Sequence, residues 1–526
     1  MEKDNLNIEL LNDLANLKVK NSNRLNKAKR RFANKYKIGM ISNADLLRLY
    51  KKQLKKKLLK PDQSLENFLQ KRKIRTLSGV APIAVLTKHY PCPGKCAYCP
   101  DEKGMPKSYL SNEPAVMRAV MTKFDPHTQV KVRIRALTDN GHSTDKIELI
   151  IMGGTWSYFP RQYQNWFVKR CFDACNGRNA KNLDQAQKWN EKAKHRIVAM
   201  TLETRPDYID EEEVRYWRKL GATKVELGVQ SLSDKVLSQN KRGHGTKATI
   251  QATKLFKQAG FKIAYHMMPN LPGSTPANDF KDFKTLFDRP EYQPDFLKIY
   301  PTVVTKNSLL FKWWQQGKYK PYSDKKLFAL LLKIKQIIPD RVRIIRLIRD
   351  IPLESIEAGN LISNLRESLQ KELQRLDKKC KCIRCREARA DLVGINQTKL
   401  YTTKYKASEA TEYFFQYTSK DKQKLFAFLR MRLPEKDEKN FIPEIQNCAM
   451  MREVHTYGKL VPIAKTKGSK KEIQHQGFGT RLTHEAEDIA RKNGFTKMAV
   501  ISGVGVRGFY RKLGYKLVGT YMVKDL

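Results

Sequence analysis

The sequence contains no apolar run as long as the roughly 18 residues that a membrane-spanning helix needs. Its N-terminus carries acidic residues early, where a signal peptide would be basic and then apolar. We therefore expect neither a signal peptide nor a membrane anchor. The expected location is the cytoplasm.

Acidic residues are scarce. The chain has 53 Asp and Glu against 102 Lys and Arg, which gives a formal net charge of +49. An AT-rich genome, which favours lysine, explains part of this excess but not its clustering. We therefore expect a polyanionic partner, with nucleic acid the first candidate. At 526 residues and 40% hydrophobic content, the chain is long enough for two or three domains, each with its own core.

The nine cysteines lack the even spread of a disulfide framework. Most fall into two tight clusters, Cys92 to Cys99 and Cys380 to Cys385, which is typical of metal ligands in a reducing compartment. Cys171 and Cys175 lie one helical turn apart in an apolar stretch, and we interpret them as core residues.

The first cluster stands in the run Tyr90-Pro-Cys-Pro-Gly-Lys-Cys-Ala-Tyr-Cys-Pro and has C-x3-C-x2-C spacing. An all-cysteine cubane iron–sulfur cluster uses four protein thiolates, so three would leave one iron open to an outside ligand. A zinc knuckle is the alternative, but zinc sites usually have a fourth protein ligand, and neither His89 nor His127 has finger spacing.

The second cluster, Cys380-Lys-Cys-Ile-Arg-Cys385, places three thiols within six residues. This spacing predicts a structural zinc site whose fourth ligand the sequence does not identify. The alternative is a set of unligated thiols, although exposed clustered thiols invite oxidation.

We expect four segments along the chain. Residues 1–76 form a basic helical arm, with lysine runs at 51–60 and 71–75 and with Leu47, Leu54 and Leu58 near helical spacing. Residues 77–340 form a barrel, 341–400 a linker region with the zinc candidate, and 401–526 a C-terminal domain. The arm is either an RNA-binding element or a solvated helix face.

Within 77–340, short apolar runs alternate with amphipathic stretches such as 210–220 and 247–259. This alternation predicts an α/β fold with a parallel sheet, in the form of a partial (β/α)6 barrel whose chemistry gathers at the carboxyl ends of the strands. The candidate strands are 81–87, 147–152, 197–203, 224–229, 262–268 and 296–304.

The C-terminal segment predicts strands at 424–431, 448–455 and 498–501 and a helix over 480–492. The loop Gln474-His-Gln-Gly-Phe-Gly479 leads into that helix, whose free N–H groups and positive dipole end would suit a pyrophosphate. The loop resembles the acetyl-CoA signature of GNAT acetyltransferases. The following 503–515 segment resembles the last helix and strand of that fold, with its tyrosine near the thioester.

The cysteine loop likewise resembles the signature of radical S-adenosylmethionine (SAM) enzymes, in which the open iron of a [4Fe-4S] cluster binds SAM. Together the two halves closely resemble the Elongator catalytic subunit family of tRNA carboxymethyluridine synthases, over residues 76–526. The strings that carry this resemblance are Ile151-Met-Gly-Gly-Thr155, Glu203-Thr-Arg-Pro-Asp-Tyr208, Leu227-Gly-Val-Gln-Ser231, Ala264-Tyr-His-Met-Met-Pro269, Arg452-Glu-Val-His455, the Gln474 loop and Tyr521-Met-Val-Lys524.

The resemblance implies formation of 5-carboxymethyluridine at the wobble position of tRNA anticodons. Acetyl-CoA would bind the GNAT cleft, and a 5′-deoxyadenosyl radical would remove a hydrogen from the acetyl methyl. The resulting carbon radical would add to the uracil ring, and thioester hydrolysis would leave the product. The implied partners are the tRNA anticodon stem-loop, SAM, acetyl-CoA and an electron donor that the sequence does not identify.

The resemblance also assigns site residues. Cys92, Cys96 and Cys99 would hold the cluster, and Tyr510 and Lys146 would be catalytic, Tyr510 because Phe509 replaces the family's adjacent tyrosine. The SAM site would contain Gly153, Gly154, Glu203, Arg205 and Gln230, and the acetyl-CoA site Lys146, Glu453, Val454, His455, Thr456, Gln474, Gly477, Phe478, Gly479, Thr480 and Tyr510.

Three other functions fit the sequence less well than tRNA modification. A protein lysine acetyltransferase with a structural iron–sulfur cluster is disfavoured because a very basic enzyme repels lysine-rich tails. A non-catalytic RNA-binding protein would not need an intact cysteine loop and CoA loop. A methylthiotransferase would need a second cysteine triad, and none precedes Cys92.

Overall fold

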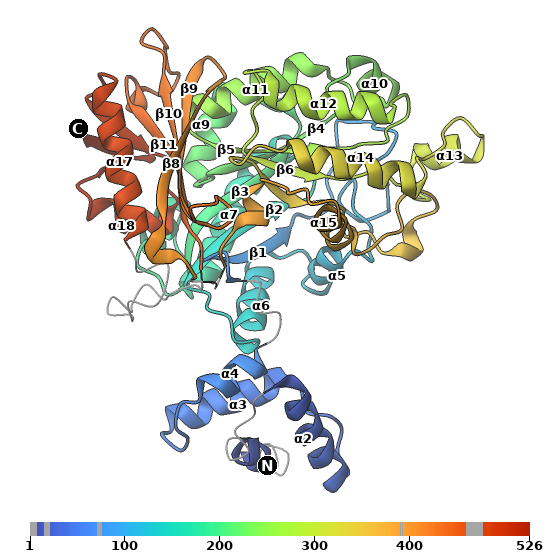
Figure 1. Cartoon of the computed structure of the whole chain (residues 1–526), viewed down its shortest axis with the longest axis vertical. Coiled ribbons are helices and arrows are strands. Elements are labelled where there is room, and N and C mark those ends of the chain that lie inside the picture. Colours follow the sequence, from blue (N-terminus) through green and yellow to red (C-terminus); the bar gives the residue numbers. More distant parts are fainter. Residues whose placement is uncertain (1–7, 15–20, 71–75, 390, 392, 459–476) are drawn as a thin grey trace.

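The computed structural model describes residues 8–14, 21–70, 76–389, 391, 393–458 and 477–526. They form a small N-terminal helical unit, a domain built on a parallel sheet, and a C-terminal domain built on a mixed sheet (Figure 1). Within these ranges, no helix combines the length and the apolar character that crossing a bilayer would require.

The N-terminal unit has its own apolar core rather than the form of an extended arm. Its labelled helices are α2 (Ser22–Lys35), α3 (Asn43–Lys55) and α4 (Gln63–Leu69), and the core includes leucines from all three. The side chains of Asn21, Ser42 and Asp62 cap the three N-termini. In Figure 1 the unit lies below the other two domains, next to α6.

The predicted leucine spacing holds for only part of this unit. Leu47 is buried and Leu54 is half-buried, but Leu58 is 67% exposed because α3 has already ended. The exposed Lys56, Lys57 and Lys60 therefore lie in the irregular segment after α3, whereas the exposed Lys55 is the last residue of that helix. The second lysine run, 71–75, lies outside the described residues.

The predicted parallel half-barrel is confirmed. Its strands pair in sequence order, all parallel, so the sheet is open between its first and last strands. A seventh strand, which the sequence did not predict, falls in the segment expected to be a linker. The strands are β1 (Ala81–Leu86), β2 (Lys146–Met152), β3 (Arg196–Thr204), β4 (Lys224–Gln230), β5 (Lys262–Met267), β6 (Phe296–Ile299) and β7 (Arg343–Arg346).

Helices connect these strands and bury apolar side chains against the outer face of the sheet. Helix α9 shows how the sequence fixes such an element: Asp210 accepts a hydrogen bond from the N–H of Glu213, and Gly221 ends the helix at a φ of 94°. The helices are α5 (Pro114–Met121), α6 (Pro126–Asp139), α7 (Arg161–Asn176), α8 (Leu183–Asn190), α9 (Glu211–Leu220), α10 (Asp234–Gln239), α11 (Thr246–Gln258), α12 (Pro276–Asp288), α13 (Leu309–Gln315) and α14 (Asp324–Ile337).

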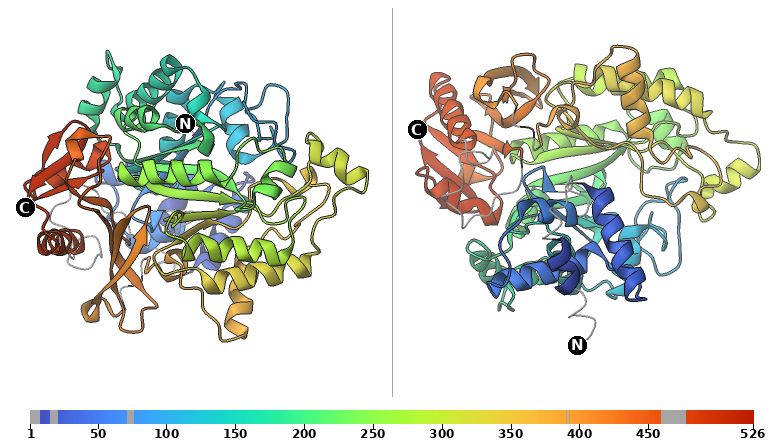
Figure 2. Two further views of the ribbon diagram at one scale, coloured as in Figure 1. Left: turned by 90° about the horizontal axis from the view of Figure 1, so that it is seen from above. Right: turned by 60° about the horizontal axis from the view of Figure 1, so that its bottom comes forward.

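Two short helices, α15 (Leu365–Arg375) and α16 (Ile383–Arg386), lead to the C-terminal domain. This domain has a mixed sheet in the order β13-β14-β12-β11-β10-β9-β8. In Figure 2 the domain, coloured orange to red, lies at one end of the molecule. Its elements are β8 (Lys399–Ala407), β9 (Ala410–Thr418), β10 (Leu425–Pro434), β11 (Ala449–Thr456), α17 (Phe478–Lys492), β12 (Lys497–Val500), α18 (Arg507–Arg511), β13 (Lys516–Val518) and β14 (Tyr521–Asp525).

Strands β11 and β12 separate partway along their length. They pair in parallel only from Ala449 to Met451, whereas β11 stays paired with β10 as far as Thr456. Beyond Met451, no strand among the described residues pairs with that edge of β11, and the N-terminus of α17 lies close by, since a Cβ on Gly479 would stand 3.8 Å from Val454. The result is a V-shaped opening in the sheet.

The two larger domains are packed backbone to backbone at one point. The 3-10 turn Val504–Val506 lies on β3, and a Cβ added to Gly503 would come within 2.0 Å of the Val198 carbonyl oxygen. A Cβ on Gly505 would come within 2.6 Å of the Arg196 Cβ. Side chains of any size are thus excluded from this contact.

Candidate active site

One large cavity reaches from the cysteine loop, through the interior of the half-barrel, to the C-terminal domain. Its volume is about 1160 Å³. The cysteines of the first cluster line one part, and Glu453, His455 and Tyr457 from the second domain line another. Between them lie side chains at alternate positions of the barrel strands, such as Lys224 and Glu226 of β4, because alternate residues of a strand face the same side.

Two arginines surround the cysteine loop. Arg242 donates to the Cys96 sulfur at 3.3 Å, and Arg205 approaches the same sulfur at 3.8 Å. Hydrogen bonding from Cys99 and the nearby Arg242 guanidinium lower the pKa of Cys96 to about 4. Gly94 permits this approach, since a Cβ there would stand 2.2 Å from an Arg205 nitrogen. The surroundings therefore favour a thiolate at Cys96, the form that binds iron, while the same hydrogen bond raises the pKa of Cys99.

The residues expected at the SAM site lie beside this loop. Gly154, Glu203, Arg205 and Gln230 line the cavity, whereas Gly153 lies just behind it, at a φ of 137° and against Thr87. Arg205 is fixed by Asp207, with Nε and Nη2 at 3.0 and 2.7 Å from the two carboxylate oxygens. The Gln230 side-chain oxygen is buried and has no hydrogen-bond partner among the described residues, so it is available to a ligand.

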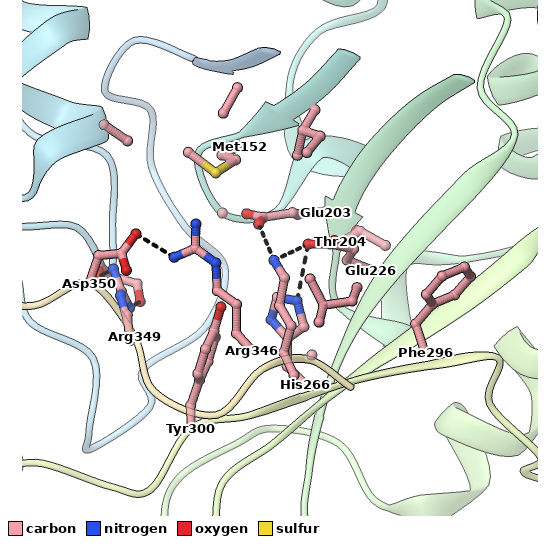
Figure 3. Close-up of a pocket in the computed structure, with 18 of the residues that line it drawn as sticks. Met152, Glu203, Thr204, Glu226, His266, Phe296, Tyr300, Arg346, Arg349 and Asp350 are labelled. Atoms are coloured by element: carbon pink, nitrogen blue, oxygen red, sulfur yellow. Dashed lines mark hydrogen bonds and ion pairs between the residues drawn. The ribbon is translucent and has the colours of Figure 1, made fainter. Parts of the chain in front are cut away.

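A set of charged side chains crosses the barrel interior next to the SAM residues. Figure 3 shows Glu203, Glu226 and His266 converging from three strands. The Lys298 ammonium lies between the two carboxylates: it forms a short ion pair with Glu226 and is 3.5 Å from Glu203. His266 Nε2 is 3.2 Å from Glu226, and Tyr109 donates to Glu203 at 2.8 Å. Two carboxylates and an imidazole could ligate a metal, but the lysine already supplies the positive charge here.

Further along the cavity, a second set of charges faces the C-terminal domain. Lys224 is 3.4 Å from Glu148, and Arg430 donates to Glu453 at 2.9 Å. Lys262 lies between these pairs on β5, nearly buried, and among the described residues it forms no side-chain hydrogen bond or ion pair. Burial, with Lys224 adding to it and Glu453 opposing it, lowers the pKa of Lys262 to about 8.

The residues expected to bind acetyl-CoA gather around the V-shaped opening. Glu453, Val454, His455 and Thr456 belong to the part of β11 that has left β12, and Glu453 and His455 also line the cavity. Gly477 precedes the α17 N-terminus at a φ of 70°, and no side chain in the described part of the chain caps this helix. Phe478, Gly479 and Thr480 form its first turn, and Gln474 lies outside the described residues.

The two residues expected to be catalytic do not line the cavity. Lys146 is the first residue of β2, at the opposite end of that strand from Gly153. Tyr510, on α18, is buried in the core of the C-terminal domain, and burial together with the Glu453 charge raises its pKa. Both lie on the side of the barrel where the C-terminal domain packs, away from the cysteine loop.

The three cysteines of the second cluster lie close together. The sulfurs of Cys380, Cys382 and Cys385 all lie within 4.8 Å of one another, and no fourth His, Cys, Asp or Glu joins them among the described residues. Cys171 and Cys175, by contrast, are buried in the barrel core, as predicted.

Sequence reasoning missed the charged interior of the barrel. Glu226, Lys298, and the pair Lys262 and His266 are isolated polar residues within three mostly apolar strands, and only the fold brings the strands together. The sequence did carry one signal for them. Charged residues recur within otherwise apolar strands of a parallel barrel, and such residues are expected to face the barrel interior, where they can pair.

Comparison with known families agrees with this architecture. The Radical SAM superfamily model matches residues 89–286, the Radical_SAM C-terminal domain matches 294–375, and the Acetyltransferase (GNAT) family matches 398–515. The three matched regions follow one another along most of the chain.

Several relatives match this chain along most of its length. The chain is 45% identical over 504 residues to the tRNA uridine(34) acetyltransferase of Methanocaldococcus jannaschii, covering 93% of this chain and 91% of that protein. It is 40% identical to the protein of that name from Dehalococcoides mccartyi (87% and 100% covered) and 37% identical to human Elongator complex protein 3 (95% and 93% covered).

A solved structure supports the assignment. The archaeal Methanocaldococcus infernus Elp3 with an N-terminal deletion matches with a TM-score of 0.74 and 42% identity, covering 85% of this chain and 100% of that one. The chain belongs to the family of the tRNA uridine(34) acetyltransferases and Elongator complex protein 3, acyltransferases that combine a radical SAM domain with a GNAT domain.

Proposed function

We propose that this enzyme forms 5-carboxymethyluridine at the wobble position of tRNA, with acetyl-CoA as the carbon source and SAM as the radical source. The observation that carries this proposal is the single cavity, which is lined both by the cysteine loop and by the GNAT strand β11. Two chemistries that share one enclosed space can act on one acyl group. The proposed substrate is a cytoplasmic RNA, and we place the enzyme there.

Cys92, Cys96 and Cys99 would hold a [4Fe-4S] cluster, and the residues beside the loop would hold SAM. The thiolate-favouring environment of Cys96 and the unpartnered oxygen of Gln230 both fit this use. When bound, the cluster and SAM supply a 5′-deoxyadenosyl radical. Glu203 and Arg205, fixed by Tyr109 and Asp207, would orient SAM in the cavity.

Acetyl-CoA would occupy the V-shaped opening. The free N–H groups of the first turn of α17 suit the pyrophosphate, and the open edge of β11 can pair with the amides of the pantetheine arm. The acetyl end would then point past Glu453 into the barrel. Lys146 and Tyr510 would contact this cofactor where the two domains meet.

A radical route suits this acyl donor. An unactivated acetyl methyl has no acidity that a side chain of ordinary pKa can use at neutral pH, so the cofactor must carry the chemistry while the protein supplies orientation. Inside the barrel, the reacting carbon would lie away from the protein surface and from most bulk water.

The tRNA would be held chiefly by the N-terminal unit, residues 1–76, and by the adjacent face of the barrel domain, 77–340. The lysines after α3 are exposed, and the chain as a whole carries +49 charges. An anticodon loop presents unstacked bases, so a target uracil can enter the cavity at a lower cost than a duplex base could.

We also propose a structural zinc in the 341–400 segment, on Cys380, Cys382 and Cys385, which precede the GNAT domain at 401–526. Lys335, fully buried, lies 3.9 Å from the Cys385 sulfur and suits a thiolate ligand set. Metal analysis of a variant with all three cysteines changed to alanine should show the loss of one zinc per chain. An unchanged zinc content would overturn this site.

The test of the function uses anaerobically reconstituted enzyme, a reductant, SAM, tRNA and acetyl-CoA labelled with ¹³C in the methyl carbon. We expect labelled 5-carboxymethyluridine at the wobble position and an equal amount of 5′-deoxyadenosine. Label found on protein lysines and none on tRNA would instead identify a lysine acetyltransferase. In cells, deletion of the gene should remove 5-carboxymethyluridine derivatives from wobble nucleosides.

A further inference from the structure

The last step of the proposed reaction has no assigned residue. After the acetyl carbon has joined the uracil, the acyl group is still a thioester of CoA, and water must attack it to release the product. This inference rests on the proposed function. The thioester carbon is then one bond from the methylene carbon on the base, so the hydrolytic group must stand at the cysteine-loop end of the cavity.

His266 is the described histidine at that place. It lies on β5 and lines the cavity. Its ring forms a hydrogen bond with Glu226 and packs edge-to-face with Tyr300, at 5.7 Å between ring centroids. The Glu203 carboxylate lies within 4.8 Å of a His266 ring nitrogen and lines the same part of the cavity. Figure 3 shows the side chains of His266, Glu226, Tyr300 and Glu203 in one group within this pocket.

The tautomer of His266 follows from its partner. Burial would raise the pKa of Glu226, but the Lys298 ammonium and the His266 hydrogen bond outweigh it and hold that pKa well below its ordinary value. Glu226 is therefore a carboxylate and can only accept. His266 Nε2, at 3.2 Å, must carry the proton and donate it, which leaves Nδ1 with a free lone pair.

The His266 imidazole is also in its neutral form near pH 7. Burial, with Lys298 adding to it, lowers the pKa of His266, while the hydrogen bond to Glu226 and the charges of Glu226 and Glu203 oppose that shift. Among the described residues, Nδ1 makes no hydrogen bond, although the ring lines the cavity. A basic nitrogen with no partner, on a ring that lines the cavity, can bind a water molecule.

We propose that His266 is the general base for thioester hydrolysis, that Glu226 positions its ring, and that Lys298 is the adjacent positive charge. Nδ1 removes a proton from water as the water oxygen bonds to the thioester carbon. The C–S bond then breaks, the imidazolium returns the proton to the departing CoA thiolate, and a carboxylic acid remains on the uracil. Nothing is oxidised or reduced in this step.

The experiment replaces the ring while keeping its size and polarity, with His266→Gln in the full-length reconstituted enzyme. We expect 5′-deoxyadenosine release within about 2-fold of wild type and release of 5-carboxymethyluridine lowered at least about 100-fold, the usual cost of losing a general base. Meanwhile CoA should accumulate on the tRNA, detectable by mass spectrometry as a uridine carrying the CoA thioester. Hydroxylamine should cleave it to the hydroxamate.

Two further variants sharpen the result. Glu226→Gln should produce the same CoA-linked tRNA with a smaller loss, about 10-fold, because the amide still holds the ring but no longer fixes the tautomer. His127→Gln, on α6 and outside the cavity, is the matched control and should keep wild-type product release.

Wild-type product release by His266→Gln would overturn the proposal. So would loss of 5′-deoxyadenosine release without any CoA-linked tRNA, because that pattern assigns His266 to an earlier step or to the fold. Failure of the proposed function itself looks different, since the wild-type enzyme would then place no labelled carbon on tRNA at all.

Discussion

Arg452 of the C-terminal domain donates hydrogen bonds to both carboxylate oxygens of Asp295, the residue before β6 of the barrel. Both side chains are buried, and Glu412 and Lys257 extend the same network, with Arg452 at 2.9 Å and Lys257 at 3.0 Å from the Glu412 oxygens. The two catalytic halves are therefore held together by paired charges as well as by apolar contact.

Arg452→Met should destabilise the protein by about 3–5 kcal/mol, because the buried Asp295 carboxylate loses the guanidinium that bonds both its oxygens and keeps only the longer ion pairs with Arg430 and Lys257. Denaturant unfolding measures this loss, and limited proteolysis should show earlier cleavage between the domains. Arg432→Met is the matched control, since Arg432 is an equally buried arginine that pairs with Glu438 inside one domain. Equal interdomain cleavage in both variants would contradict a specific role for the Asp295 pair.

Cys96→Ser should abolish both the iron absorbance and 5′-deoxyadenosine release, since the cluster needs all three thiolates of the loop. Anaerobic reconstitution followed by absorbance and product analysis measures both. Cys448→Ala, at a buried cysteine outside both clusters, should retain both signals. Full SAM cleavage by the Cys96 variant would remove the cluster from this loop.

Gly479→Arg should block acetyl-CoA binding, because the new side chain would fill the opening between α17 and β11. Gly479→Ala should bind normally, since its Cβ would make only ordinary contacts, at 3.6 Å to Phe509 and 3.8 Å to Val454. Calorimetric titration with acetyl-CoA distinguishes the two, and SAM cleavage reports whether the barrel is intact. Normal binding by the arginine variant would place acetyl-CoA elsewhere.

Neutralising Lys55, Lys56, Lys57 and Lys60 should weaken tRNA binding and flatten its salt dependence. Each lost phosphate contact should reduce the log–log slope by roughly 0.7–0.9. Acetyl-CoA binding should not change. Neutralising four exposed lysines of the C-terminal domain, Lys420, Lys422, Lys436 and Lys439, is the control for net charge. Equal effects of the two sets would mean that the N-terminal unit has no dedicated RNA surface.

The charge of Lys262 should make stability depend on pH. Its pKa falls from 10.5 in the unfolded chain to about 8 in the fold, so the unfolded chain binds more protons between these values and stability rises with pH through that window. The difference amounts to about 3 kcal/mol. The stability advantage of Lys262→Met should therefore shrink by that amount between pH 7.5 and 10.5.

Unfolding curves at both pH values test this expectation. Lys219→Met removes an exposed lysine from α9 and should show no comparable change with pH. A constant difference between the Lys262 variant and the wild type would show that this lysine keeps its ordinary pKa in the fold.

The parts of the site that sequence could predict are contiguous. Cys92, Cys96 and Cys99 share one loop, and Gly477 and Gly479 share one turn, so their spacing alone carries chemical information. The half-barrel was equally readable, because each strand and helix is a local pattern. The strand β7 was not, since Arg343–Arg346 has only two apolar residues between charged ends.

The barrel interior could not be read in this way. Lys298 meets Glu226 across 72 positions of sequence, and Arg452 meets Asp295 across 157. No local pattern encodes such a pairing, which depends on the order of the strands and on the packing of two domains. The exposed position of Leu58 has the opposite origin: a local turn ended α3 before the leucine period was complete.

The contact of Gly503 and Gly505 with β3 has a consequence for how such proteins can change. Because the turn lies directly on the main chain of β3, a side chain added at Gly503 or Gly505 would force the two domains apart, whereas a change of strand side chain need not. A chimera that joins the acetyltransferase domain of one relative to the barrel of another should therefore keep this contact only if the incoming turn has glycine at both positions.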